Sequence, residues 1–114
     1  MRYVMIICDE EAVAGPESPT EHAAQPEFMA WQAEVDRRGV VRGGERLRPT
    51  SDATTVRVRD GEVLVADGPF AETKEQMGGF TIIECADLDE AIELAARHPV
   101  ARWGTIEVRP IWES

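Results

Sequence analysis

The dipeptide Asp60-Gly61 constrains the fold of this chain more than any other feature. It lies between two segments that alternate polar and apolar residues, Thr54 to Arg59 and Glu62 to Ala66. Aspartate followed by glycine favours the positive φ angles of a type I′ turn, which joins two antiparallel strands through a two-residue loop. The middle of the chain is therefore predicted to be a β-hairpin with one segment on either side of it.

The segment before the hairpin contains a strand, a helix and a second strand. The apolar run at residues 3–8 favours a central strand that is buried on both faces. Residues 18–21 have the layout of a helix start, with a proline at the first helical position, and a main helix is predicted over 26–38. A kinked strand follows at 40–48. The main helix has an apolar stripe of Phe28, Trp31 and Val35.

The segment after the hairpin repeats this order. A strand is predicted at residues 80–85, a helix from the capping box at 87–90 to His98-Pro99, and a last strand at 105–112. Pro110 in that strand indicates an edge or bulged position. The order β-α-β, hairpin, β-α-β predicts a ferredoxin-like α+β sandwich with its helices on one face of an antiparallel sheet. The second helix should bury Leu88, Ala91, Ile92 and Ala95.

Length and charge restrict the class of protein. The chain of 114 residues has the size of one domain, and its net charge of -10 disfavours binding to nucleic acid or to an anionic membrane surface. No window is apolar enough to span a membrane, and the first residues lack the layout of a signal peptide, so a cytoplasmic protein is expected. Cys8 and Cys85 are expected to be buried thiols without a disulfide.

Residues 67–80 form a second informative segment, because they lack apolar periodicity and yet contain strong turn residues. Pro69 fixes its own φ angle, Gly68 can adopt a positive φ, and Gly78-Gly79 allows a bend before the strand at Phe80. The segment reads Asp-Gly-Pro-Phe-Ala-Glu-Thr-Lys-Glu-Gln-Met-Gly-Gly-Phe. It closely resembles the signature of the DGPF-domain branch of the YCII-related proteins. The resemblance also takes in residues 1–7, 43–47, 54–61, 87–91 and 106–112.

The resemblance has consequences for assembly and chemistry. YCII-related proteins are similar to the dimeric α+β barrel superfamily, in which two sheets pack face to face, so the resemblance implies a homodimer. A histidine and an aspartate have been proposed as a catalytic pair in such proteins, and the resemblance implies His98 and Asp67 for these roles. The superfamily includes lactone isomerases and dehydrochlorination enzymes, which implies isomerase or lyase chemistry.

Each member of this pair also has a structural alternative. His22 lies among acidic residues and is expected to be solvated, which leaves His98 as the candidate general acid or base. His98 could equally be a residue that stops the helix and caps its carbonyls. Asp67 could orient an imidazole, or it could form an Asx-turn with the backbone N–H groups of residues 68–70.

Four further residues are candidates for substrate binding. Arg109 and Arg46 could hold an anionic group, or they could be solvated or paired with glutamates. Tyr3 and Trp103 could line a pocket, or they could belong to the core or a dimer interface. No spacing of His, Cys and carboxylate residues indicates a metal site, and no motif indicates a cofactor or a nucleotide.

These observations predict a cofactor-independent enzyme that transfers a proton within a small, partly apolar substrate. A non-catalytic domain that binds a small ligand or regulates a partner is the alternative, and DGPF-type proteins commonly resemble companions of extracytoplasmic-function sigma factors. A dimeric scaffold without a pocket is the third hypothesis. An enzyme should require His98, whereas a sensor should depend on apolar pocket residues.

Overall fold

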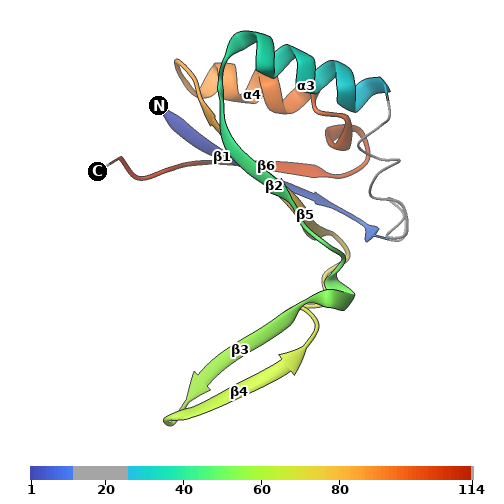
Figure 1. Ribbon diagram of the computed structural model, residues 1–114, viewed down its shortest axis with the longest axis vertical. Coiled ribbons are helices and arrows are strands. Elements are labelled where there is room, and N and C mark those ends of the chain that lie inside the picture. The colour runs from blue at the N-terminus through green and yellow to red at the C-terminus, as the bar shows by residue number, and fades with distance from the viewer. Residues whose placement is uncertain (12–25, 114) are drawn as a thin grey trace.

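The computed structural model describes residues 1–11 and 26–113 (Figure 1), so the helix start predicted at 18–21 and His22 lie outside the described residues. Its strands are β1 (Arg2–Asp9), β2 (Val41–Arg46), β3 (Thr54–Arg59), β4 (Glu62–Asp67), β5 (Gln76–Glu84) and β6 (Thr105–Pro110). Its helices are α3 (Pro26–Arg38) and α4 (Leu88–Arg97), with two 3-10 turns, η1 (Thr50–Asp52) and η2 (Pro99–Arg102).

Four strands form the main sheet in the order β2-β5-β1-β6, and all neighbouring strands are antiparallel. The two helices lie side by side on one face of this sheet (Figure 1). This arrangement confirms the predicted ferredoxin-like α+β fold. The strand with Pro110 is an edge strand, as predicted, because a proline cannot donate to a second neighbour.

The core lies between the helices and the sheet. Tyr3 and Met5 of β1 and Ile83 of β5 are buried there, against Val35 and Trp31 of α3. Strand β1 is central, as predicted, but it is not buried on both faces, because the helices cover one side of the sheet and leave its outer side chains half-buried (Figure 1). The half-buried apolar residues of the outer face are Val4, Ile6, Phe80 and Ile82, together with Cys8, and the charged Glu107 and Arg109 of β6 lie on the same face.

The buried stripe of α4 differs from the prediction. Ala91 and Ala95 are buried as expected, but Leu94 is fully buried whereas Leu88 and Ile92 are 47% and 50% exposed. Ala91, Leu94 and Ala95 follow the i, i+3, i+4 spacing of a single helix face, and Trp31 Nε1 of α3 donates to the Leu94 carbonyl at 2.9 Å. The predicted capping box is present, since Glu90 N donates to Asp87 Oδ1 at 2.9 Å.

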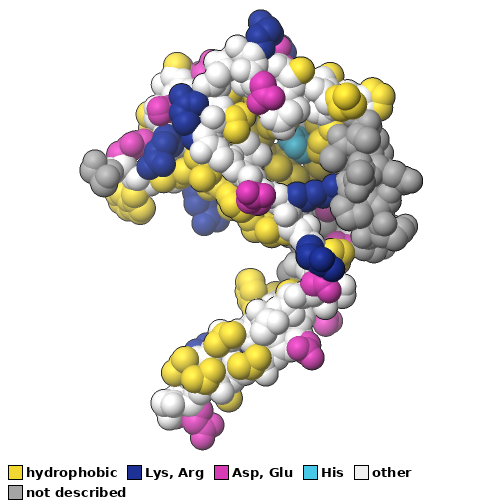
Figure 2. All heavy atoms as spheres, viewed as in Figure 1, with side chains coloured by type: hydrophobic (Ala, Val, Ile, Leu, Met, Phe, Trp, Pro, Cys, Tyr) yellow, Lys and Arg dark blue, Asp and Glu magenta, His cyan; other side chains and the backbone are white. Residues whose placement is uncertain are grey.

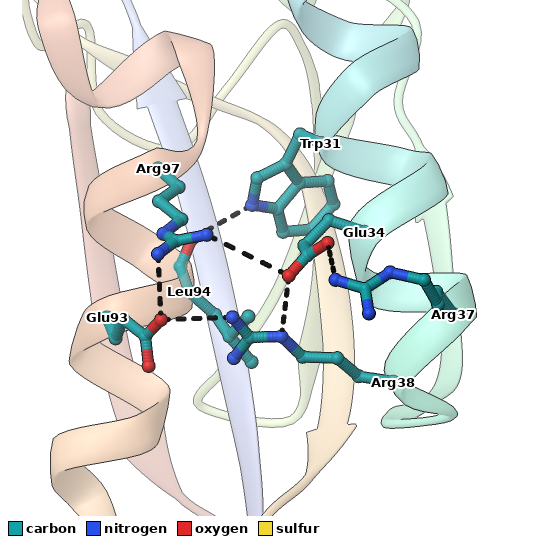
Figure 3. A network of polar contacts seen from close by, with 7 residues as sticks. All are labelled: Trp31, Glu34, Arg37, Arg38, Glu93, Leu94 and Arg97. Carbon is teal, nitrogen blue, oxygen red and sulfur yellow. Dashed lines mark hydrogen bonds and ion pairs between the residues drawn. The ribbon is translucent and has the colours of Figure 1, made fainter.

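Charged side chains join the exposed edges of α3 and α4 (Figure 3). Arg38 contacts Glu34 on its own helix at 2.9 Å and Glu93 on α4 at 3.0 Å. These hydrogen bonds raise the pKa of Arg38 and lower that of Glu93. The network links the exposed edges of α3 and α4 above the buried Trp31. Its other members are Arg37 and Arg97.

Glycines allow the close approach of β2 and β5. The register shifts between Val41 and Gly43, which is the predicted kink. A Cβ at Gly44 would lie 2.5 Å from the Phe80 carbonyl oxygen, so only glycine fits there. Strand β5 begins at Gln76 rather than at Phe80 as predicted, because Gly79 pairs with Ile7 and Arg46, while Gly78 is skipped in the register with β1 as a bulge.

Strands β3 and β4 form a separate two-stranded sheet, which is the predicted hairpin. Asp60 and Gly61 have φ angles of 52° and 78°, as a type I′ turn requires. The hairpin extends away from the helices and the main sheet (Figure 1). The radius of gyration is accordingly 15.8 Å, against about 13 Å for a compact domain of this length. Within residues 1–11 and 26–113, no helix has both the length and the apolar character needed to cross a bilayer.

Candidate active site

A pocket of about 450 Å³ lies between α3 and the end of the main sheet formed by β1, β2 and β5. Its walls are mostly apolar, and the glycine pairs of β2 and β5 contribute backbone to its lining. Figure 2 shows this hollow, with a histidine side chain inside it. The polar and aromatic side chains around it are Asp9, Phe28, Trp31, Gln32, Glu45, Arg46, Thr81 and His98.

His98 reaches the pocket because it ends α4 and begins η2. Pro99 moves the His98 backbone out of helical space, to φ -66° and ψ 131°, so the helix stops there. The side chain is 3% exposed and lies edge-on to the rings of Trp31 at 4.7 Å and Phe28 at 5.2 Å between centroids. Burial among these groups lowers the pKa of His98 from 6.5 to about 4.

The hydrogen bond that the His98 ring accepts determines which of its two nitrogens carries the proton. The Nδ1 atom accepts from the backbone N–H of Val100 at 3.1 Å. A backbone N–H can only donate, so Nδ1 carries no hydrogen and the neutral ring holds its proton on Nε2. At neutral pH, His98 is therefore a hydrogen-bond donor through Nε2 and has no free nitrogen with which to accept a proton.

Asp9 is the buried carboxylate of this pocket. It ends β1 and is 9% exposed. Along a strand, alternate residues share a face, so Asp9 follows Tyr3, Met5 and Ile7 toward the helices. Its Oδ1 atom lies 3.7 Å from the position that a Cβ would take at Gly78, so the glycine leaves room beside the carboxylate.

Arg46 lies at the rim of the pocket, at the end of β2. Its side chain remains exposed, and neighbouring atoms still displace enough water to lower the pKa of the guanidinium. The negative charge of Asp9 opposes this shift. Among the residues that the structure describes, Arg46 forms no ion pair. It is therefore a cation that a bound anion could use.

The structure brings together His98 and Arg46 among the six predicted site residues, and it places Asp67 elsewhere. Asp67 is exposed at the end of β4, on the hairpin that extends away from the helices (Figure 1), and does not line the pocket. No hydrogen bond found within the described residues joins its carboxylate to residues 68–70. The base of the hairpin is closed by Gly68 N to Ala53 O at 2.8 Å and by Thr55 Oγ1 to Gly68 O at 2.7 Å.

The other three candidates also lie outside the pocket lining. Arg109 is on β6 opposite Val4, at the outer face of the sheet, and forms an ion pair with Glu107. Tyr3 is 2% exposed in the core, and its burial raises the pKa of the phenol. Trp103 is half-buried after η2. Arg109, which is paired with a glutamate, and Tyr3, which belongs to the core, therefore have the structural roles that the sequence left open as alternatives.

Asp9 and the tautomer of His98 were missed by sequence reasoning. A signal for Asp9 was present, because a carboxylate that continues the alternation of Tyr3, Met5 and Ile7 must face the helices. The tautomer had no signal, since it depends on the N–H of Val100 two residues later in a turn. No group of three or more His, Cys, Asp and Glu residues within 1–11 and 26–113 is arranged to hold a metal ion.

Comparison with known proteins gives two findings. The family model of the YCII-related domain matches residues 1–114. A relative from Rhizobium meliloti (strain 1021), named an uncharacterized protein, is 40% identical over 114 residues, which cover 97% of this chain and 92% of the relative. Neither description names a reaction or a ligand, so the function is inferred from the residues of the pocket.

Proposed function

The chain belongs to the YCII-related family, and we propose that it is a cofactor-independent enzyme that transfers a proton within a small organic substrate. The observation that carries this proposal is the combination, in one apolar pocket, of a buried carboxylate and an imidazole that is neutral at physiological pH. Proton transfer needs a group that accepts a proton and a group that stabilises the resulting negative charge.

Asp9 is the group that accepts the proton in this proposal. Its carboxylate is buried in the pocket lining, where a bound substrate would meet it away from bulk water. His98 then donates a hydrogen bond from Nε2 to the oxygen on which charge develops, and it keeps its own proton. Asp9 therefore takes the role of base that was expected of His98, His98 is a donor, and Asp67 has no part in this proposal.

Arg46 and the aromatic residues define the substrate class. The guanidinium at the rim would bind a carboxylate or another anionic group of the substrate. Trp31 and Phe28 would contact its apolar part. A pocket of about 450 Å³ suits a small metabolite. A small oxo acid or a lactone-derived acid meets these conditions, and isomerisation or elimination would begin with loss of a proton beside its carbonyl group.

Hydrogen–deuterium exchange of candidate substrates tests this proposal without knowledge of the complete reaction. A panel of small oxo acids and lactones is incubated with the protein in D₂O, and loss of the C–H signals is followed by NMR. We expect at least one compound to exchange faster with the protein than without it. Asp9→Asn should slow this exchange about 100-fold or more, which is the usual contribution of a general base.

The matched control is Asp60→Asn, which changes the same functional group in the hairpin turn, where asparagine tolerates a positive φ. This variant should exchange its substrate at the rate of the unchanged protein. Equal rates for Asp9→Asn would contradict the role of Asp9. Compounds that bind in the pocket without any exchange would contradict catalysis altogether.

A non-catalytic ligand-binding or regulatory domain is the second candidate, and the structural role of His98 favours it. The ring caps η2 and packs on two aromatic residues, which is sufficient reason for its presence without catalysis. A regulatory partner such as an extracytoplasmic-function sigma factor belongs to this candidate. It predicts that His98→Asn, which retains an acceptor for Val100 N, leaves ligand affinity largely unchanged.

We also propose a cytoplasmic homodimer of the DGPF branch. The signature at residues 67–80 supports the branch, and two free thiols, Cys8 and Cys85, suit a reducing compartment. The support for a dimer is the half-buried outer face of the main sheet, which includes Val4, Ile6 and Ile82. A sheet whose second face is apolar is normally covered by another layer.

A further inference from the structure

The hairpin of β3 and β4 has one face made almost entirely of valine. Cross-strand pairing places Val56 opposite Val65 and Val58 opposite Val63, so that these four side chains share a face. They are 57% to 67% exposed. Figure 2 shows hydrophobic side chains gathered along the hairpin, away from the rest of the molecule. We call this surface the valine face.

A two-stranded hairpin with one exposed apolar face lacks a layer that would bury this face. Two strands without further strands or a helix against them are marginally stable in water. An exposed apolar face on a projecting element also promotes association. Even so, the turn geometry and the closing hydrogen bonds at Gly68 and Thr55 are those of a well-formed hairpin. The valine face therefore requires an apolar surface to cover it.

The charges restrict what that surface can be. Between Thr54 and Asp67 there are two arginines against three acidic residues, so the hairpin is nearly neutral although the whole chain carries -10. On the valine face itself, the one charged side chain is Asp67 at its base. An apolar protein surface suits this face, and a second copy of the chain can approach it without strong repulsion from the net charge.

The size of the hairpin favours a second copy over an unrelated partner. Stable interfaces bury about 800 Å² on each side and involve about 20–30 residues. The hairpin supplies two strands of six residues and a two-residue turn, with one face available, which is too little by itself. In a dimer with two-fold symmetry, the same surface of each of the two chains contributes to the interface, so each contact occurs twice. Such a dimer can also bury the uncovered outer face of the main sheet, with Val4, Ile6 and Ile82, in the same interface.

We propose that the hairpin of β3 and β4 is a dimerisation arm whose valine face packs against a second copy of this chain. The proposal rests on the proposed homodimer and deepens it, and it is independent of the proposed enzymatic function. It also differs from contact between the main sheets alone, because it makes the arm necessary for the dimer. Each arm lies in water in the free chain and is covered in the dimer.

Adjacent residues on opposite faces of β4 provide the test. Val63→Lys places a charge on the valine face, and Leu64→Lys places the same charge on the other face of the same strand. Molar mass is measured by sedimentation from about 1 to 100 µM protein, since dimerisation depends on concentration. We expect a dimer of twice 12.7 kDa for the unchanged chain. Val63→Lys should weaken it about 30-fold or more, and Leu64→Lys less than about threefold.

Amide hydrogen exchange gives a second readout, because Val63→Lys could disturb the hairpin itself. In the unchanged chain, amides of β3 and β4 should exchange more slowly as concentration rises, while those of the core strand β1 should not change. The proposal is overturned by a monomer at 100 µM, by a Val63→Lys dimer of unchanged affinity, or by arm amides whose protection is independent of concentration. The second of these results would leave a dimer through the main sheet.

Discussion

The helix–sheet layers and the projecting hairpin both contain aliphatic side chains, but these are buried in the layers and exposed in the hairpin. In the layers, leucine, isoleucine and valine side chains are buried by a second layer, and His98 and Asp9 are held in place by that packing. In the hairpin, valine and leucine side chains are exposed, and the geometry comes from the turn and the cross-strand pairs. The comparison shows that a hairpin can have well-defined turn and pairing geometry without a hydrophobic core of its own. Its stability then depends on contacts with another surface.

A leucine pair measures this difference most directly. Leu94 in α4 is fully buried, whereas Leu64 in β4 is 46% exposed. Leu94→Ala should lower the free energy of unfolding by about 3–5 kcal/mol, because it leaves a cavity in the core. Leu64→Ala should lower it by less than about 0.5 kcal/mol, since no buried contact is lost. Urea unfolding of both variants checks the prediction.

Equal losses for the two leucines would contradict the separation into layers and hairpin. The helix–sheet core would then extend into the hairpin. Leu64→Ala should also leave any dimer unchanged, because this residue lies on the face opposite to the valine face.

The burial of His98 predicts a pH effect that belongs to the layers and is absent from the hairpin. Its pKa is about 4 in the folded chain against about 6.5 in the unfolded chain. Between these values the unfolded chain binds the proton more readily, so stability falls as the pH is lowered from 6.5 to 4. This single group should cost about 3 kcal/mol at pH 4, and it should have no effect above pH 7.

The measurement is the free energy of unfolding at pH 7 and pH 4.5 for the unchanged chain and for His98→Asn. Other carboxylates titrate in the same window, so the difference between the two pH slopes isolates His98. The slope should be smaller in the variant. Titration of the ring by NMR with a midpoint near 6.5 would contradict the burial of His98 and, with it, the neutral donor of the proposed mechanism.

The sequence predicted the fold well because its signals are local. Asp60-Gly61 sets the φ angles of its own turn, and the capping box at Asp87 makes its hydrogen bond three residues away. The outward rotation of Leu88 and Ile92 could not be predicted in this way. It depends on which side of α4 packs against α3 and the sheet, and this packing joins distant residues, as in the hydrogen bond between Trp31 and the Leu94 carbonyl 63 positions away.

Fewer features of the site could be predicted, because the pocket is formed by residues that are far apart in the sequence. His98 could be identified because there are two histidines, and Arg46 because it follows a glycine pair. The partner of His98 depends on which strand ends lie beneath α3. The sheet order β2-β5-β1-β6 brings Asp9 there, whereas the hairpin carries Asp67 away. The motif at residues 67–80 identified the family and ends in the pocket lining at Gly78-Gly79, but its acidic residue Asp67 lies on the hairpin.

Two glycines should distinguish steric constraint in the layers from conformational constraint in the hairpin. A Cβ at Gly44 would meet the Phe80 carbonyl oxygen at 2.5 Å, whereas one at Gly61 would have nothing within 4 Å. Gly44→Ala should cost about 2–3 kcal/mol, mainly through overpacking between β2 and β5, with a smaller part from its own positive φ of 150°. Gly61→Ala should cost about 1 kcal/mol through its φ of 78° alone. Thermal unfolding compares the two, and the reverse order would show that β2 can move away from β5.

The smallest effect should occur where the two regions meet. Thr55 Oγ1 donates to the Gly68 carbonyl at 2.7 Å and closes the base of the hairpin. Thr55→Val retains the shape of the side chain and removes this bond, which should cost about 0.5–1 kcal/mol locally. Because the hairpin opens without unfolding the layers, the urea midpoint should hardly change, while the amide of Gly68 should exchange several-fold faster. A loss of global stability as large as the local loss would instead show that the hairpin and the layers unfold as one cooperative unit.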